Sequence, residues 1–189
     1  ELRGLAYINM NRFPDAIRDY RTVTDMLPEN RSLWHNLALC YIETDSLDQA
    51  DSITDIIIRR WAKQADGYTL KAQVFLQRND TAAAETYIDK AIEADKYNIG
   101  AHTAKANILM SHEQYNEAIQ HFDESLRLNP KQANTLINRA LCHYHLNHYR
   151  DAMADYDRAL DLEPKNFIGH YNRGLLRANV GEDNLAIED

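Results

Sequence analysis

Residues 133–166 read ANTLINRALCHYHLNHYRDAMADYDRALDLEPKN, and the 34 residues before them, 99–132, align with this stretch without a gap. The same 34-residue offset brings the rest of the chain into register, again without an insertion or deletion. One column of the alignment holds alanine in every repeat, at Ala16, Ala50, Ala84, Ala118, Ala152 and Ala186. A fixed period of this length is typical of a protein built from stacked supersecondary units.

A second column holds only glycine or alanine, at Gly4, Ala38, Ala72, Ala106, Ala140 and Gly174. Large side chains recur elsewhere in the repeat, such as Tyr41 in one column and Phe122 in another. Small residues at fixed places indicate close contacts between helices. Apolar residues also recur at helical spacing, as in Leu33, Leu37 and Tyr41, so each repeat is predicted to hold two amphipathic helices.

The predicted helix ends recur with the same period. Residues that tolerate a left-handed backbone follow the first helix at Asn11, Asp45, Asn79, Asn147 and Gly181. Only Glu113 departs from this pattern. Proline ends the second helix at Pro28, Pro130 and Pro164, because it lacks the backbone N–H and restricts the residue before it.

These columns resemble the tetratricopeptide repeat, whose pattern runs from Trp through Leu, a small residue, Tyr, Ala, an aromatic residue and Ala to Pro. One repeat carries Trp34, Leu37, Ala38, Tyr41 and Ala50, and another carries Ala140, Ala152, Tyr156, Ala159 and Pro164. The resemblance covers the whole chain. It implies an all-α fold, a right-handed superhelical α-α solenoid of antiparallel helix pairs.

We expect residues 1–189 to form a single array of such repeats. The predicted units are a partial one at 1–30, four complete ones at 31–64, 65–98, 99–132 and 133–166, and a partial one at 167–189. Both ends of the chain fall within a repeat, so we expect the sequence to be a piece of a longer array. Ile57 occupies a column of small residues, and we expect it to spread the helices locally.

The resemblance also implies a function. In tetratricopeptide proteins the first helices line a concave groove, which suits an extended peptide or a helix of a partner protein. The residues expected to face this groove are His35, Asn36, Leu39, Thr69, Gln73, Thr103, Asn107, Ile137, Asn138, Leu141, His145, Tyr171, Asn172 and Leu175. The apolar residues near the C-terminal end have another explanation, because a following repeat would normally cover them. Asparagine in the column of Asn138 is likewise common in repeats that have no known ligand.

Charge and hydropathy narrow the class of partner. A net charge of −8 and a pI near 5.4 argue against nucleic acid and against an anionic membrane surface, since both require a basic face. No apolar run approaches the roughly 20 residues that a membrane span needs, so no membrane insertion is expected. We therefore expect a protein scaffold with a protein partner. The alternative is an array that associates with itself through its open apolar ends, without a dedicated peptide ligand.

No enzymatic activity, cofactor or metal site is predicted. His143 and His145 point to different faces of a helix, which leaves only His145 and His148 as a histidine pair able to converge.

Cys40 and Cys142 lie in the same column three repeats apart, too far for a disulfide, and each is expected to fill a small core space. Two unpaired thiols favour the cytoplasm, while the cell envelope and secretion remain open.

Overall fold

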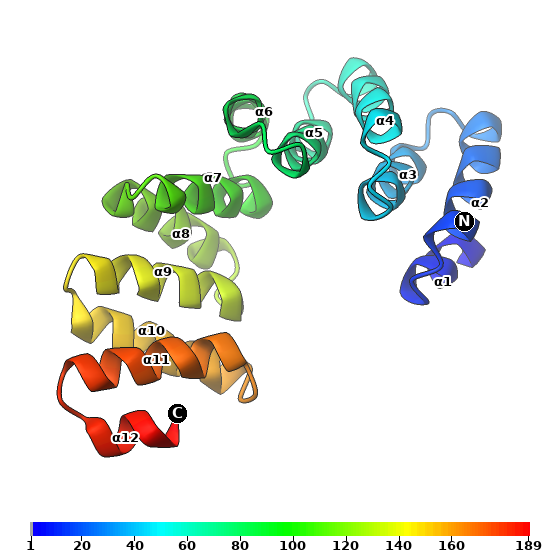
Figure 1. Ribbon diagram of the computed structural model, residues 1–189. Coiled ribbons are helices and arrows are strands. Elements are labelled where there is room, and N and C mark those ends of the chain that lie inside the picture. The colour runs from blue at the N-terminus through cyan, green and yellow to red at the C-terminus, as the bar shows by residue number, and fades with distance from the viewer. Residues whose placement is uncertain (1) are drawn as a thin grey trace. The chain divides into compact units, whose positions relative to one another are not determined.

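A computed structural model of the chain describes residues 2–189, and over that range it contains helices and no β-strand (Figure 1). The twelve helices are α1 (Leu2–Asn9), α2 (Phe13–Met26), α3 (Arg31–Glu43), α4 (Leu47–Arg60), α5 (Ala65–Gln77), α6 (Thr81–Ala94), α7 (Ile99–Ser111), α8 (Tyr115–Leu128), α9 (Ala133–His145), α10 (Tyr149–Leu162), α11 (Phe167–Asn179) and α12 (Asp183–Glu188). The predicted all-α class is confirmed. None of the helices in the described range combines the length and the apolar character needed to cross a membrane.

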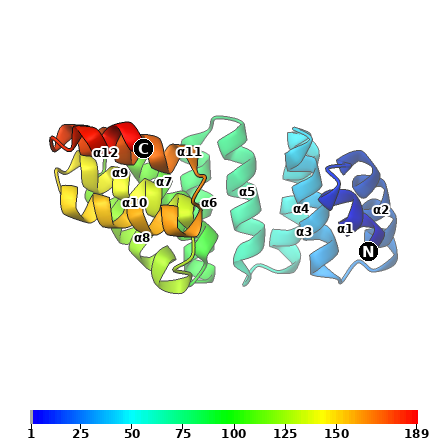
Figure 2. The same ribbon diagram turned by 90° about the horizontal axis from the view of Figure 1, so that it is seen from below.

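The chain divides into two compact units. Unit 1 comprises Glu1–Ala101, which holds α1 to α6 and the first turn of α7, and unit 2 comprises His102–Asp189, which holds the rest of α7 and α8 to α12. Within each unit, an odd-numbered helix packs against the even-numbered helix that follows it, and that helix packs against the next odd-numbered one (Figures 1 and 2). The first helices of successive repeats also touch, α3 with α5 and α9 with α11.

The turn inside each repeat uses one left-handed residue. Asn11, Asp45, Asn79 and Asn147 have φ between 53° and 59°, as their residue types predict. Glu113 takes the same conformation with φ 60°, although its side chain has no preference for it. The geometry of the repeat therefore imposes the left-handed residue even where the sequence does not favour one.

The alanine column lies at the centre of each helix contact. Ala16, Ala50, Ala84, Ala118 and Ala152 are all fully buried, and the large side chains of neighbouring columns fill the space around them. The glycine of the other small column shows how tight the fit is, because a Cβ added to Gly4 would lie 2.9 Å from the Tyr20 ring. Small residues therefore face large ones across the helix pairs, which is why the two columns tolerate so little volume.

Ile57 is the branched residue in a column of small side chains, and it is fully buried in the core of unit 1. Gly67 on α5 leaves room for it. A Cβ at Gly67 would lie 2.9 Å from Cγ2 of Ile57 and 3.2 Å from the backbone nitrogen of Ile58. The large residue on α4 and the missing side chain on α5 form a matched pair.

Ion pairs connect successive repeats at a cationic column that includes Lys71, Arg139 and Arg173. Arg139 on α9 lies between two second helices, 2.5 Å from Asp123 on α8 and 2.6 Å from Asp155 on α10. Its side chain is 16% exposed and that of Asp155 only 5%. Lys71 and Arg173 each pair with aspartates of the second helix of the preceding repeat. The column therefore neutralises part of the acidic charge of the second helices.

The fit between Ile57 and Gly67 predicts that Gly67→Ala destabilises the chain despite the better helix propensity of alanine. Overpacking costs about 1–3 kcal/mol and the gain in propensity is about 1 kcal/mol, so we expect a net loss of about 1 kcal/mol in urea unfolding followed by circular dichroism. The matched control is Gly100→Ala, because a Cβ there meets only the Asn98 side chain at 3.5 Å. Equal effects of the two substitutions would contradict this explanation, as would an undiminished cost of Gly67→Ala in an Ile57→Ala background.

The position of Arg139 predicts that Arg139→Ala lowers the free energy of unfolding by about 1–3 kcal/mol, because it leaves the buried carboxylate of Asp155 without its two-pronged partner. The same urea measurement on Arg150→Ala, which removes an exposed arginine of α10, should change stability by less than about 0.5 kcal/mol. In an Asp155→Asn background, Arg139→Ala should lower the free energy of unfolding by less than it does in the original chain. An equal loss in both backgrounds would show that the ion pair with Asp155 does not account for the effect.

Candidate functional site

The candidate groove residues of unit 1 lie on the first helices α3 and α5 and are all half-buried: His35, Asn36, Leu39, Thr69 and Gln73. Several are engaged in the structure itself. Asn36 donates its side-chain N–H to the Tyr20 hydroxyl at 3.2 Å, and Leu39 packs against the core. The Thr69 hydroxyl donates to the backbone carbonyl of Asp66 at 2.9 Å. Asn36 and Thr69 therefore each use part of their hydrogen-bonding capacity within the fold.

His35 differs from its neighbours because its Nδ1 atom is buried and has no hydrogen-bond partner. Burial lowers the pKa of its imidazole, with the Asp66 carboxylate opposing that shift and the Arg31 guanidinium adding to it. The ring is therefore neutral near pH 7.

The polar candidates of unit 2 form a pair of linked amides. Asn138 on α9 donates its side-chain N–H to the side-chain oxygen of Asn107 on α7 at 2.9 Å, and both residues are half-buried. An amide group carries two N–H donors and one oxygen that accepts, so this bond leaves Asn138 its oxygen and Asn107 its NH₂. Thr103 is bonded to the Ser125 hydroxyl at 2.8 Å and lies half-buried on the same helix as Asn107.

The apolar candidates of unit 2 differ in exposure. Ile137 is 2% exposed and belongs to the core, where it lies beside Gly169 of α11, so it offers no surface to a ligand. Leu141 is half-buried on α9. Tyr171 and Leu175 on α11 are 58% and 49% exposed. Asn172, beside Tyr171, is half-buried.

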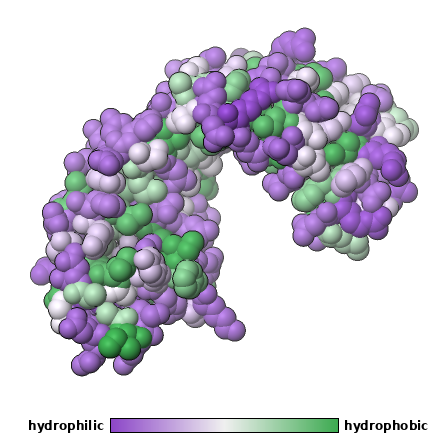
Figure 3. Space-filling view, viewed as in Figure 1, coloured by the Kyte–Doolittle hydropathy of each residue, from purple (hydrophilic) through white to green (hydrophobic). Residues whose placement is uncertain are grey.

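Exposed apolar side chains of α11 and α12 form a patch of Phe167, Tyr171, Leu175 and Ile187, which line one hollow. Phe167 and Ile187 are about four-fifths exposed, and Figure 3 shows hydrophobic areas on this part of unit 2 with hydrophilic side chains between them. The hollow has a volume of about 450 Å³ and is lined mainly by apolar side chains.

Unit 1 contains a hollow that the sequence did not predict. It has a volume of about 540 Å³ and lies among α2, α3 and α4, with Trp34, Leu37 and Tyr41 of α3 among its lining residues. All three belong to columns of the repeat pattern, so the sequence marks them only as core residues. The half-buried Trp34 and Tyr41 are also accessible from this hollow, whereas Leu37 is buried.

Three histidines lie near the end of α9. Helical spacing left His145 and His148 as the histidine pair able to converge, but His145 is exposed and stacks on Tyr115, with ring centroids 4.6 Å apart. Instead His143 comes close to His148 and Asp151. His148 lies beyond the end of α9, after the turn, so the spacing of residues on a helix does not predict where its side chain points. Burial lowers the pKa of His143, which favours its neutral ring.

Comparison with known proteins decides the family. Models described as tetratricopeptide repeat match residues 2–51, 65–98, 99–132 and 133–166, which together make up most of the chain. The chain belongs to the tetratricopeptide repeat family. Among curated proteins, anaphase-promoting complex subunit 7 of Homo sapiens is 28% identical over 141 residues, and that of Mus musculus is 27% identical over 141 residues. Each match covers 74% of this chain and 24% of the relative, so the chain spans about a quarter of their length.

Solved structures show the same tetratricopeptide fold. A chain of the APC/C hetero-tetramer Cut9-Hcn1 has a TM-score of 0.85 at 20% identity, with 98% of this chain and 37% of that chain covered. PilF of Pseudomonas aeruginosa has a TM-score of 0.77 at 20% identity, with 85% and 73% covered. YrrB, a tetratricopeptide protein with an unusual peptide-binding site, has a TM-score of 0.64 at 15% identity, with 90% and 88% covered. The predicted α-α solenoid class is thereby confirmed.

Tetratricopeptide scaffolds are typically non-catalytic, and the two thiols of this member are poorly suited to nucleophilic chemistry. Burial raises the pKa of Cys40 to about 11 and that of Cys142 to about 12. Both side chains are fully buried and unpaired with each other. A thiol held in its neutral form is a weak nucleophile. The repeat fold and the relatives together support a protein-interaction scaffold as the class of function.

The burial of both thiols in this tetratricopeptide chain predicts that neither reacts with a chromogenic disulfide reagent at pH 8 while the chain is folded. The same reagent should titrate two thiols per chain in denaturant, because unfolding restores an ordinary thiol pKa. The labelling is followed by absorbance and by intact mass. Rapid modification of Cys142 in the folded chain, with Cys40 protected, would contradict the assignment of Cys142 as an inert core residue.

Proposed function

We propose that this chain is a scaffold that holds a partner protein, and that the first helices of unit 2 bind an extended segment of that partner. The observation that carries the proposal is the pair of amides formed by Asn107 and Asn138 at 2.9 Å. The pair lies across two successive first helices, α7 and α9, where the family resemblance expects the groove.

The amide pair suits a peptide backbone. Each peptide unit of an extended chain presents one N–H donor and one carbonyl acceptor, and the pair keeps an oxygen on Asn138 and an NH₂ group on Asn107 for such partners. The bond between the two amides holds both side chains in place, so binding costs little additional side-chain entropy. Asn172 occupies the column of Asn138 one repeat later and would extend the row of amides onto α11.

Exposed apolar side chains next to the amides supply anchors. Tyr171 and Leu175 on α11 expose about half of their surface, and Leu141 on α9 is partly accessible. A tyrosine contributes a large apolar area and a polar tip at a small entropic cost, which is why such residues often dominate binding energy. The proposed surface therefore comprises Asn107, Asn138, Leu141, Tyr171, Asn172 and Leu175, and it omits the buried Ile137.

The relatives support the same class of function. Anaphase-promoting complex subunit 7 is, by its name, a component of a larger protein complex. YrrB is described as a tetratricopeptide protein with a peptide-binding site. Both support a role in which this chain contacts another protein.

The exposed patch on α11 and α12 favours a second candidate function, self-association. Phe167 and Ile187 are 78% and 84% exposed, a degree of apolar exposure that often marks an interface. In this alternative the patch packs against another copy of the chain. Light scattering over a concentration series separates the two functions, because a peptide-binding monomer keeps the mass of one chain.

The groove proposal predicts that Asn138→Ala and Tyr171→Ala each weaken peptide binding by about tenfold, since each removes a central contact of the surface. Peptides selected from a displayed random library against the chain serve as the probe, and their Kd values are measured by isothermal titration calorimetry. Asp161→Ala, an exposed change on the second helix α10, is the matched control and should leave Kd unchanged.

Circular dichroism must show that each variant is folded. The proposal fails if the double variant Asn138→Ala, Tyr171→Ala binds the selected peptides as tightly as the original chain. It also fails if peptide binding depends on Asp161 to the same extent.

A further inference from the structure

The turn between α9 and α10 brings the ends of these two helices close together. Asn147 takes the left-handed conformation with φ 59°, and the backbone N–H of His148 donates to the carbonyl oxygen of His143 at 2.9 Å. His143 belongs to the last turn of α9, and His148 directly precedes α10. The reversal of the chain therefore sets a side chain of α9 beside those at the start of α10.

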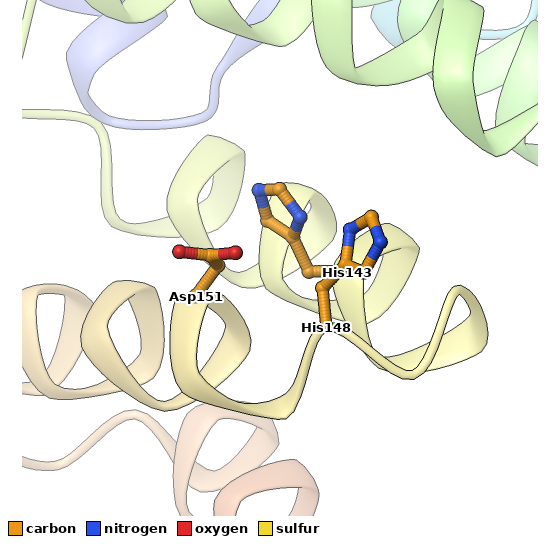
Figure 4. A group of neighbouring side chains, drawn as sticks. All are labelled: His143, His148 and Asp151. Atoms are coloured by element: carbon orange, nitrogen blue, oxygen red, sulfur yellow. The ribbon is translucent and has the colours of Figure 1, made fainter.

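Three potential metal ligands meet at this turn. One ligand atom each from His143, His148 and Asp151 lies within 4.8 Å of the other two (Figure 4). His148 and Asp151 are three residues apart at the start of α10, a spacing that places side chains on one face of a helix. Figure 4 shows the His143 ring between the Asp151 carboxylate and the His148 ring.

The first repeat shows that these three columns converge because of the fold. There the equivalent residues are Tyr7, Arg12 and Asp15. The Arg12 guanidinium donates to the Asp15 carboxylate at 2.6 Å and lies 4.8 Å from the centre of the Tyr7 ring. In that repeat an ion pair and an aromatic ring occupy the place. In the repeat at 133–166, the same place carries two imidazoles and a carboxylate.

The other repeats do not place three metal-ligand residues in these columns. The third repeat, for example, has Phe75, Asp80 and Ala83, and Asp80 is used to cap the backbone N–H of Ala83 at 3.0 Å. The second repeat has Tyr, Ser and Gln at the equivalent positions, 41, 46 and 49. The set at 143, 148 and 151 is therefore specific to one repeat and is not a requirement of the repeat pattern.

The hydrogen bonding of His143 is a second, independent observation at this turn. Its Nδ1 atom is buried and has no hydrogen-bond partner, which is costly for a polar atom. Phe75 and Tyr41 occupy the same column in other repeats. Their rings contain no nitrogen atom, so burying them leaves no ring atom in need of a hydrogen bond. An imidazole that replaces a packed aromatic ring and keeps an unsatisfied nitrogen points to a ligand for that ring.

The chemistry of the three side chains selects the class of ion. Two imidazoles and one carboxylate suit borderline divalent metals such as Zn²⁺, whereas Ca²⁺ and Mg²⁺ prefer sites made only of oxygen. With Zn–N bonds of about 2.1 Å, tetrahedral ligand atoms lie about 3.4 Å apart, so the three groups need to close by roughly 1 Å. His148 and Asp151 are exposed, which leaves them free to rotate toward the ion.

We propose that His143, His148 and Asp151 bind one Zn²⁺ ion at the turn between α9 and α10, with the remaining position open to water. The ion connects the end of α9 to the start of α10 and supplies the partner that His143 lacks. Such a site stabilises one hairpin of the array, because metal that binds only the folded chain adds its binding free energy to folding.

The test is calorimetric titration of ZnCl₂ into the metal-free 189-residue chain in a buffer that does not chelate metal. We expect one ion per chain, and a melting temperature that rises with the free zinc concentration and returns to its original value when a chelator is added. His148→Ala and Asp151→Asn should each weaken binding at least about tenfold, since even the loss of an outer-shell group commonly costs that much. His143→Phe restores the aromatic residue of the column, so it should keep the fold and lose the zinc.

Three histidine variants serve as matched controls. His145→Ala removes the other histidine of the same turn, and His112→Ala removes an exposed histidine after α7. His121→Ala disrupts the close contact of His102 and His121, whose Nδ1 atoms are 3.0 Å apart. All three should bind zinc like the original chain. The proposal is overturned if the chain binds no zinc in the micromolar range, or if these controls lose zinc while His148→Ala and Asp151→Asn retain it.

Discussion

The close approach of paired helices depends on one position per repeat that never exceeds a methyl group. Across the two units that position is filled by alanine, and the five alanines from Ala16 to Ala152 are completely removed from solvent. A larger side chain there would push the helices apart. The buried rings of Tyr20, Phe122 and Tyr156 would then lose packing contacts. Since this constraint recurs every 34 residues, the framework is nearly the same in each repeat, and the residues that differ between repeats are free to serve binding.

The sequence predicted the helices and their order well because the relevant forces are local. The spacing of apolar residues, the left-handed Asn and Asp residues and the prolines at 28, 130 and 164 act within a few residues of one another. Glu113 is instructive in this respect. It has none of the residue preferences that mark the turn, yet it adopts φ 60°, so the neighbouring packing decides its conformation.

The features that the sequence did not predict join residues across a turn or between helices. Arg139 bridges Asp123 and Asp155, each 16 residues away, and such a spacing has no helical or strand signature. The convergence of His143 with Asp151 requires the direction of the turn after α9. Ile137 was assigned to the groove from its column, but Gly169 on the next first helix leaves space that its side chain fills. The burial of Ile137 therefore depends on a residue of the next repeat, and the sequence of its own repeat does not reveal it.

Over the described residues, the main helix contacts within the two units join neighbours along the chain or helices two apart. The mean sequence separation of contacting residues is therefore small, which is associated with rapid folding. As the chain emerges during synthesis, each new hairpin can dock on the one before it, without waiting for a distant segment to be translated. Such an array can gain or lose a whole repeat in evolution with little effect on how the remaining hairpins reach their structure.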